Sequence, residues 1–205
     1  MAGGHMKYRH LSRKSSHRQA LLRNLVTSLF ENESISTTWH KAKEAQRLAE
    51  KLVTLGKKNT EASRRRAHQI FYRPIEMVPK LFGPIRERYA ERPGGYTRVL
   101  RIEPLKEDQA ASAILELVDG PKDMRFAMTA RTLANVRRNK HAVNEITQTN
   151  IDKVTRYRKN GEEELEELTE KMEELLDREA TKGPPAVTKR KVYPKEEVRT
   201  HAGFF

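Results

Sequence analysis

The 205-residue sequence contains no cysteine, few aromatic residues and no long apolar run. The absence of cysteine excludes disulfide frameworks, thiolate zinc sites and cysteine nucleophiles. No apolar stretch approaches the roughly 18 residues that span a bilayer, and no signal-peptide core is present, so we expect neither a membrane span nor secretion. Because 36% of the residues are hydrophobic and 34% are charged, we expect a modest core with extended or partner-dependent segments.

Acidic residues are also missing from the first thirty positions, which hold six lysines and arginines. The whole chain has a formal charge of +13. Such an excess repels itself unless a polyanion neutralises it, and nucleic acid is the commonest polyanionic partner. A membrane surface is the rival polyanion, but the basic residues are not confined to one juxtamembrane block. The charge balance therefore predicts a nucleic-acid-binding protein.

Charge also suggests how the chain is organised. Residues 1–120 carry a net charge of +10, and the remainder alternates between +7, −8 and +4 over residues 121–160, 161–180 and 181–205. Such alternation is typical of an appendage. We therefore expect a basic RNA-contacting arm (1–16), a core domain (17–120) and an extension (121–205) that comprises a basic helical part (121–160), an acidic helix (162–179) and a Pro/Lys-rich tail (181–205).

Apolar periodicity predicts several helices. A capping-box pattern at Ser16 and Gln19 precedes the first helical repeat. A second helix is expected from about Lys41, and a third over residues 60–72. Pro79 and Pro84 are expected to break or restart a further helix.

Short β-branched or alternating segments predict strands over residues 34–38, 96–102 and 113–118, the last two as a hairpin. The predicted class is α+β, with a small three-stranded mixed sheet covered by helices and a mainly helical C-terminal extension.

Apolar residues of the extension are expected to serve as anchors. In the acidic helix they follow a 3-4-3 spacing over about two heptads, which is too short for a stable coiled coil alone, so this helix is expected to dock on another surface. The anchors are Phe126, Met128, Leu133 and Val136 in the basic part and Leu165, Leu168, Met172 and Leu175 in the acidic helix.

The sequence lacks the common signatures of catalysis. Its seven histidines never occur at metal-ligand spacing, Gly94-Gly95 belongs to no phosphate-binding loop, and no G-x-S-x-G motif occurs. We therefore expect that the chain is not an enzyme and that it binds neither a metal ion nor a cofactor.

The strongest positive signal is the opening arm, in which cations alternate with hydroxyls and planar rings. Arginine and lysine neutralise phosphates, while serine, histidine and tyrosine add hydrogen bonds or stack on exposed bases. A basic tail without a ligand and a mitochondrial transit peptide are alternative interpretations of the same composition. The RNA-binding residues predicted here are Lys7, Arg9, His10, Arg13, Lys14, Ser15, Ser16, His17 and Arg18, followed by Arg23 on the first helix.

Three further groups are candidate RNA contacts. Hydroxyls and cations at the start of the second helix favour phosphate contact, with ordinary capping as the alternative, and Trp39 between them is interpreted as a core or interface residue. An arginine triplet fans over nearly a full helical turn, so part of it must face solvent or phosphate. A glycine-rich turn allows close backbone approach between flanking arginines, with a plain start of a hairpin as the alternative. The candidates are Thr37, Thr38, Lys41 and Lys43, then Arg64, Arg65 and Arg66, then Arg92, Gly94, Gly95, Tyr96, Thr97 and Arg98.

Several of these motifs, taken in order over about residues 6–120, resemble the bacterial-type large-subunit ribosomal protein seventeen family. The resemblance rests on Arg9-His10, Ser15-Ser16-His17-Arg18-Gln19-Ala20, Arg23-Asn24, Thr37-Thr38 with Lys41-Ala42-Lys43-Glu44, Gly94-Gly95-Tyr96-Thr97-Arg98 and Glu116-Leu117-Val118-Asp119. It implies a small α+β protein without catalytic residues that binds large-subunit ribosomal RNA and neighbouring ribosomal proteins near the polypeptide exit.

The chain departs from the family pattern at His40, where proline is usual, at Pro93, and over residues 121–205, which exceed the ordinary bacterial length. The extension resembles the enlarged ribosomal proteins of mitochondria, especially fungal ones. We therefore expect a structural constituent of the mitochondrial large subunit, in the matrix, whose extension contacts mitochondria-specific ribosomal proteins or RNA. The alternatives are a bacterial cytoplasmic location, a free RNA- or DNA-binding regulator, and an RNA-modifying enzyme.

Overall fold

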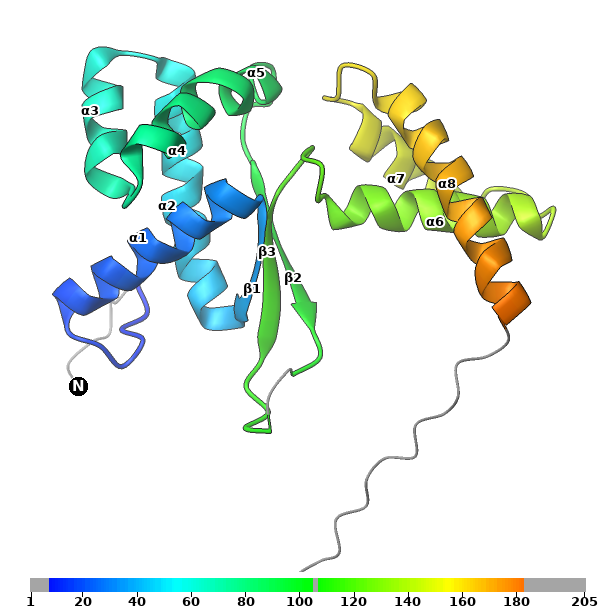
Figure 1. The fold of residues 1–205 in the computed structure, drawn as a ribbon, viewed down its shortest axis with the longest axis horizontal. Helices are drawn as coiled ribbons and strands as arrows, with labels where there is room; N and C mark the ends of the chain where they lie inside the picture. Colours follow the sequence, from blue (N-terminus) through cyan, green and yellow to red (C-terminus); the bar gives the residue numbers. More distant parts are fainter. Residues whose placement is uncertain (1–7, 105–106, 183–205) are drawn as a thin grey trace, which may run out of the picture.

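A computed structural model describes residues 8–104 and 107–182 of the chain. Figure 1 shows helices α1 to α5 on one side of a narrow sheet and helices α6 to α8 on the other. The elements are α1 (Ser15–Asn32), β1 (Ser34–Thr38), α2 (Trp39–Lys58), α3 (Glu61–Ile70), α4 (Pro74–Lys80), the π-helical turn η1 (Leu81–Ile85), α5 (Arg86–Arg88), β2 (Thr97–Ile102), β3 (Ser112–Leu117), α6 (Met124–Arg138), α7 (Glu145–Thr155) and α8 (Gly161–Lys182).

The predicted α+β class, the three strands and the hairpin formed by the last two are confirmed. The strand order is β1-β3-β2, and both pairings are antiparallel, so the prediction of a mixed sheet is wrong. The reason is the position of β3. It lies between β1 and β2 and runs opposite to both, so the two strands that share a direction never pair with each other.

One face of the sheet forms the floor of the main core. Ala113, Leu115 and Leu117 alternate along β3 with no exposed surface, so one face of the strand turns its apolar side chains to the core. Helices α1 and α2 cover this face, contributing Phe30 and Leu52, which are also fully buried. The core is therefore a two-layer packing of helices on a sheet.

Small residues let α2 approach its neighbours closely. Ala42, Ala45 and Ala49 on α2 are fully buried. At the other end of the helix, a Cβ atom added to Gly56 would lie 3.1 Å from Leu81 Cδ1, so η1 packs against the backbone of α2 there. This central helix carries much of the candidate site described below.

Two of the predicted helix boundaries need correction. Helix α1 begins at Ser15, with Lys14 in the N-cap position and no side-chain capping bond, so the predicted capping box at Ser16 and Gln19 is wrong. Ser16 lies inside the first turn, where its hydroxyl is past the capping position. Helix α2 begins at Trp39, two residues before the predicted start.

The two prolines that were predicted to break the fourth helical segment, Pro79 and Pro84, behave differently. Pro79 lies inside α4 without ending it, contrary to the prediction that it would break the helix. Pro84 follows Gly83, whose φ of −96° and ψ of −107° are not helical, so the predicted break occurs there. The chain therefore turns at Gly83 and continues into α5.

The extension forms a second, smaller cluster of its own. Phe126, Val154 and Leu165, one from each of its three helices, are at most 6% exposed and pack together. The acidic helix α8 therefore docks on α6 and α7 of its own chain.

Charge complementarity accompanies this packing. Arg137 of the basic α6 donates to Glu166 of α8 at 2.7 Å, and Arg138 lies 3.6 Å from Asp177. The basic segment and the acidic helix predicted from the sequence thus pair their opposite charges within one small helical unit.

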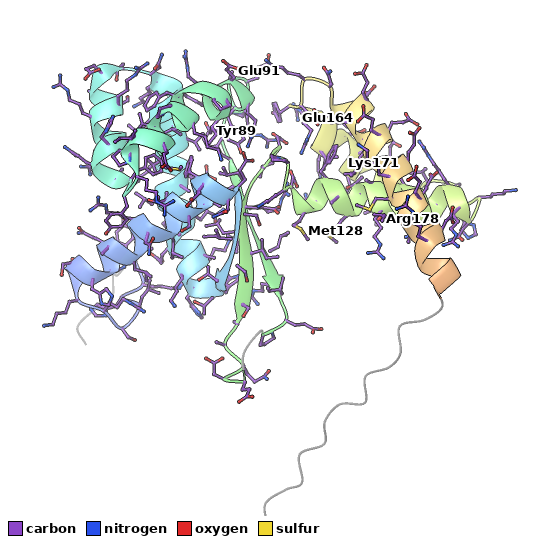
Figure 2. All side chains as sticks on the ribbon, in the orientation of Figure 1. Tyr89, Glu91, Met128, Glu164, Lys171 and Arg178 are labelled. Atoms are coloured by element: carbon purple, nitrogen blue, oxygen red, sulfur yellow. The ribbon has the colours of Figure 1, made fainter. Side chains whose placement is uncertain are left out.

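Two of the apolar anchors predicted in the extension are exposed. Met128 is 62% exposed and Leu175 is 48% exposed. Met128, labelled in Figure 2, follows buried Phe126 by two residues, which is about 200° around the helix, so the two side chains point in nearly opposite directions. Residues 183–205 of the predicted tail lie outside the described residues.

A buried ionic network joins the extension to the core. Arg98 on β2 donates from Nη1 to Glu116 Oε1 on β3 at 2.7 Å and to Asp123 Oδ1 at 2.6 Å. Asp123 is the N-cap of α6 and also accepts from the backbone N–H of Arg125 and Phe126. The first turn of α6 is therefore attached to the hairpin through one guanidinium.

The two carboxylates of this network titrate in opposite directions. Burial raises the pKa of Glu116, and repulsion from Asp123 adds to the increase. Burial also opposes the charged form of Asp123, but the attraction of Arg98 and the backbone donors outweigh it, so the pKa of Asp123 is lowered. Asp123 therefore stabilises the fold above its unfolded-state pKa, and that contribution is lost as the pH falls through its lower folded-state pKa.

Removing the shared cation tests this joint. Arg98→Ala leaves Glu116 and Asp123 buried together without a counter-charge, so we expect the free energy of unfolding to fall by about 3 kcal/mol. Arg101→Ala, on the same strand but exposed, is the matched control and should cost less than about 1 kcal/mol. Urea denaturation of the full chain measures both losses. Equal losses would contradict a structural role for Arg98.

Candidate RNA-binding surface

The basic arm is folded against α2 by one buried carboxylate. Glu44 is 2% exposed, yet its Oε1 accepts from Arg9 Nη1 at 3.2 Å and its Oε2 accepts from Arg18 Nη2 at 2.6 Å. Arg18 Nε also donates to the backbone carbonyl of Arg9 at 2.7 Å. These bonds fix the arm across the start of α1. Both arginines thus have a structural role that their charge alone did not predict.

Around this anchor, the arm presents its other polar side chains to solvent. His10, Lys14, Ser15, Ser16 and His17 are exposed. Arg13 is half-buried and donates to the carbonyl of Leu11 at 2.7 Å. Lys7 lies outside the described residues. The predicted arm residues that the structure describes therefore divide into three arginines held by the protein and five outward-facing residues.

Trp39 is half-buried against the main core, and cations surround its ring. The guanidinium carbons of Arg9 and Arg101 are 5.2 Å and 4.6 Å from its ring centroid, and Lys43 Nζ is 5.7 Å away. The quadrupole of an indole ring attracts cations at these distances. Trp39 thus gathers positive charge at the junction of β1 and α2.

The hydroxyls beside Trp39 behave more simply. Thr37 and Thr38 are half-buried, and Thr38, the N-cap residue of α2, makes no side-chain capping bond. Ordinary capping, the alternative interpretation of these hydroxyls, is therefore not observed for Thr38. Lys41 and Lys43 are half-buried on the first turn of α2.

All three arginines of the triplet on α3 are exposed, which confirms that the triplet faces outward at least in part. Each forms a hydrogen bond with a nearby side chain: Arg64 donates to Asn59, Arg65 to Glu61 and Arg66 to Gln69. These contacts are local and solvent-exposed, so they contribute little to stability. Arg23 on the facing α1 donates to the carbonyl of Ile70 at 2.9 Å and lies 4.3 Å from the ring centroid of Tyr72.

The glycine-rich turn brings its backbone to the surface but keeps its arginines inside. Gly94 and Gly95 are exposed, and the φ of +66° at Gly95 lies in the left-handed region that favours glycine. Arg92 donates twice to Asp119 Oδ2, at 3.0 and 2.7 Å, and Arg98 belongs to the buried network described above. The flanking arginines therefore hold the hairpin and the extension in place.

The two residues after the glycines are buried in the same turn. The backbone N–H groups of Tyr96 and Thr97 donate to the carboxylate of Glu50, as does the Thr97 hydroxyl at 2.6 Å. Tyr96 and Thr97 thus tie the start of β2 to α2. Their side chains are only 5% and 6% exposed.

Two cations of the surface were not singled out from the sequence. Arg47 and Lys51 are exposed on α2, one and two turns after Lys43. Their four-residue spacing places the three side chains on one stripe of the helix. The four-residue spacing could have identified these two cations from the sequence, but the apolar stripe of the same helix is the stronger pattern.

The part of the chain covered by residues 8–104 and 107–182 holds no group of three or more His, Asp or Glu side chains that could bind a metal ion. Among the same residues, no helix is both long and apolar enough to cross a membrane.

Comparison with known proteins agrees with a basic, non-catalytic surface of this kind. The family described as Ribosomal protein L17 matches residues 21–118. "Large ribosomal subunit protein bL17m" of Neurospora crassa is 64% identical over 176 residues, which is 85% of this chain and 91% of the relative. The protein of the same name from Schizosaccharomyces pombe is 48% identical over 169 residues, 82% of each chain. "Large ribosomal subunit protein bL17" of Fusobacterium nucleatum is 50% identical over 111 residues, 54% of this chain and 95% of the relative.

The fold and these similarities define the class as a structural ribosomal protein and not an enzyme. Within that class, the chain belongs to the ribosomal protein L17 family.

The Glu44 anchor can be tested by releasing the arm. Glu44→Gln removes the charge that holds Arg9 and Arg18, so we expect trypsin to cleave after Arg9, Arg13 and Lys14 about ten times faster, since a cleavage site must open before it is cut. Glu31→Gln, which removes an exposed carboxylate on the same core, should leave these rates unchanged. Limited proteolysis with mass spectrometry measures them. Unchanged cleavage in Glu44→Gln would show that the arm is held by something else.

Proposed function

We propose that this chain is a structural constituent of the large subunit of the mitochondrial ribosome in the matrix, where its core binds ribosomal RNA and supports subunit assembly. The observation that carries the proposal is the sorting of its cations. Buried carboxylates bind one set of arginines, and a second set of cations faces outward on the arm, α2 and α3. A surface on which cations outnumber carboxylates is the electrostatic footprint of a phosphate-binding protein.

The proposed contacts follow this division. Outward-facing residues of the arm, of the outer stripe of α2 and of the arginine triplet would neutralise phosphates. Arg92 and Arg98 would act by fixing the hairpin, while the exposed Gly94 and Gly95 allow an RNA backbone to approach closely. The proposed phosphate contacts are His10, Lys14, Ser15, Ser16, His17, Lys41, Lys43, Arg47, Lys51, Arg64, Arg65 and Arg66.

We propose that the neighbours of the protein are large-subunit ribosomal proteins near the polypeptide exit, and that the extension contacts mitochondria-specific ribosomal proteins or RNA. The alignments support this division of labour. The 176 residues shared with the Neurospora protein cannot fit within residues 1–120, so they include part of the extension, whereas the Fusobacterium protein aligns over 54% of the chain. The extension thus follows the fungal relatives, whose name carries the mitochondrial suffix.

Neutralising outward-facing cations tests the RNA contact. The triple variant Lys14→Gln, Arg64→Gln and Arg65→Gln should bind ribosomal RNA more weakly. The slope of log affinity against log salt, which is negative, should fall in magnitude by about 2 to 3, since each of the three lost phosphate contacts removes roughly 0.7 to 0.9. Filter binding of full-length protein to large-subunit ribosomal RNA over a salt series measures the slope.

The matched control removes three exposed lysines from the extension, Lys122, Lys140 and Lys153, and should leave the slope nearly unchanged. Equal effects of the two triple variants would mean that only net charge matters, as for a free nucleic-acid-binding protein. The ribosomal assignment itself is tested by cosedimentation with mitochondrial large subunits in moderate salt. Recovery only in ribosome-free fractions would contradict it.

A further inference from the structure

A hollow of about 390 Å³ lies between the arm and helices α1, α2 and α3. Its apolar lining comes from Leu22, Leu48 and Ile70, one from each helix. Leu22 and Ile70 are 8% and 9% exposed, so they show only a small aliphatic surface at the bottom of the hollow. Ligand sites usually combine such an apolar floor with a few fixed polar groups, in volumes of roughly 300 to 1,000 Å³.

The rim of the hollow is positively charged. Arg47 and Lys51 approach it from α2 and Arg66 from α3. The acidic side chain in its lining, Glu44, is almost fully buried and already bonded to Arg9 and Arg18. The rim therefore favours an occupant that carries negative charge beside a flat apolar part.

An aromatic ring and two amides complete the site. The ring of Tyr8 is 58% exposed, and the guanidinium carbons of Arg18 and Arg47 lie 5.8 and 5.3 Å from its centroid. Gln19 and Gln69 line the hollow, and the Oε1 of Gln69 accepts from Arg66 at 2.8 Å. A tyrosine face offers stacking for a planar ring, and amide groups can both donate to and accept from a base edge.

We propose that this hollow binds one unpaired nucleotide extruded from the RNA, with its base over the aliphatic floor beside Tyr8 and its phosphate on Arg47, Lys51 and Arg66. The proposal rests on the proposed function and names a recognition element within it. Stacked bases of a duplex cannot reach a recessed floor, whereas a bulged or looped base can be splayed out and stacked on an aromatic side chain. The combination of ring, amides and cations favours a nucleotide over an acidic peptide, which needs neither a stacking face nor amides.

The test compares two RNA hairpins that differ by a single bulged 2-aminopurine nucleotide. Full-length protein should bind the bulged hairpin about tenfold more tightly than the paired one, with a change in 2-aminopurine fluorescence on binding. Tyr8→Ala should abolish this preference while leaving the affinity for the paired hairpin unchanged. Tyr72→Ala is the matched control, because Tyr72 is also exposed but lies outside the lining of the hollow, and it should keep the preference.

Equal affinity of the unaltered protein for the two hairpins would overturn the proposal, and so would a preference that persists in Tyr8→Ala. In either case, salt-dependent binding to both hairpins would leave the proposed RNA-binding function standing. Binding to neither hairpin would contradict that function as well. Tyr8 is exposed, so its replacement does not threaten the core, and circular dichroism of both tyrosine variants confirms that they fold.

Discussion

The pairing of arginines with a few buried carboxylates organises this strongly basic chain. Glu44 holds the arm, Glu33 holds Arg88 at 2.9 Å, Asp119 holds Arg92, and Glu116 with Asp123 holds Arg98. Each pair joins segments that are distant in the sequence. A charged group that loses its partner inside a protein is costly, so every pair constrains the position of both of its segments. The cations that remain outside this scheme form the surface available to a polyanion.

Patterns in the sequence predicted the elements of the core well and their exact beginnings less well. The strands and their hairpin follow from the alternation of apolar residues such as Ile, Val, Leu and Ala, and the helices follow from apolar residues three or four positions apart. Burial of one face of each element dictates these periods. The capping box failed because the chain before Ser15 is held by Glu44 from another helix, and local capping chemistry carries no information about that contact. The order of the strands likewise depends on where β3 inserts, and that position is determined by tertiary packing and not by the local sequence.

The candidate site shows the same limit in another form. Composition identified basic segments correctly, but it could not tell an arginine that faces outward from one that faces a buried acid. Arg64 and Arg98 look alike in the sequence, yet one is exposed on α3 and the other lies between two carboxylates. The acids that decide the matter, Glu116 and Asp123, are far from α3 and close to β2. In the extension, alternating charge predicts an appendage, and α6 and α8 also use these opposite charges to bind each other.

The central claim is that the arm, α2 and α3 form the main RNA-binding surface, while the extension contacts components specific to mitochondria. Ultraviolet crosslinking of the purified mitochondrial large subunit, with crosslinked peptides mapped by mass spectrometry, tests it most directly. The account predicts RNA crosslinks concentrated within residues 8–66. For the extension it predicts crosslinks to neighbouring components over residues 124–182. RNA crosslinks confined to the extension, with none on the arm, α2 or α3, would contradict it.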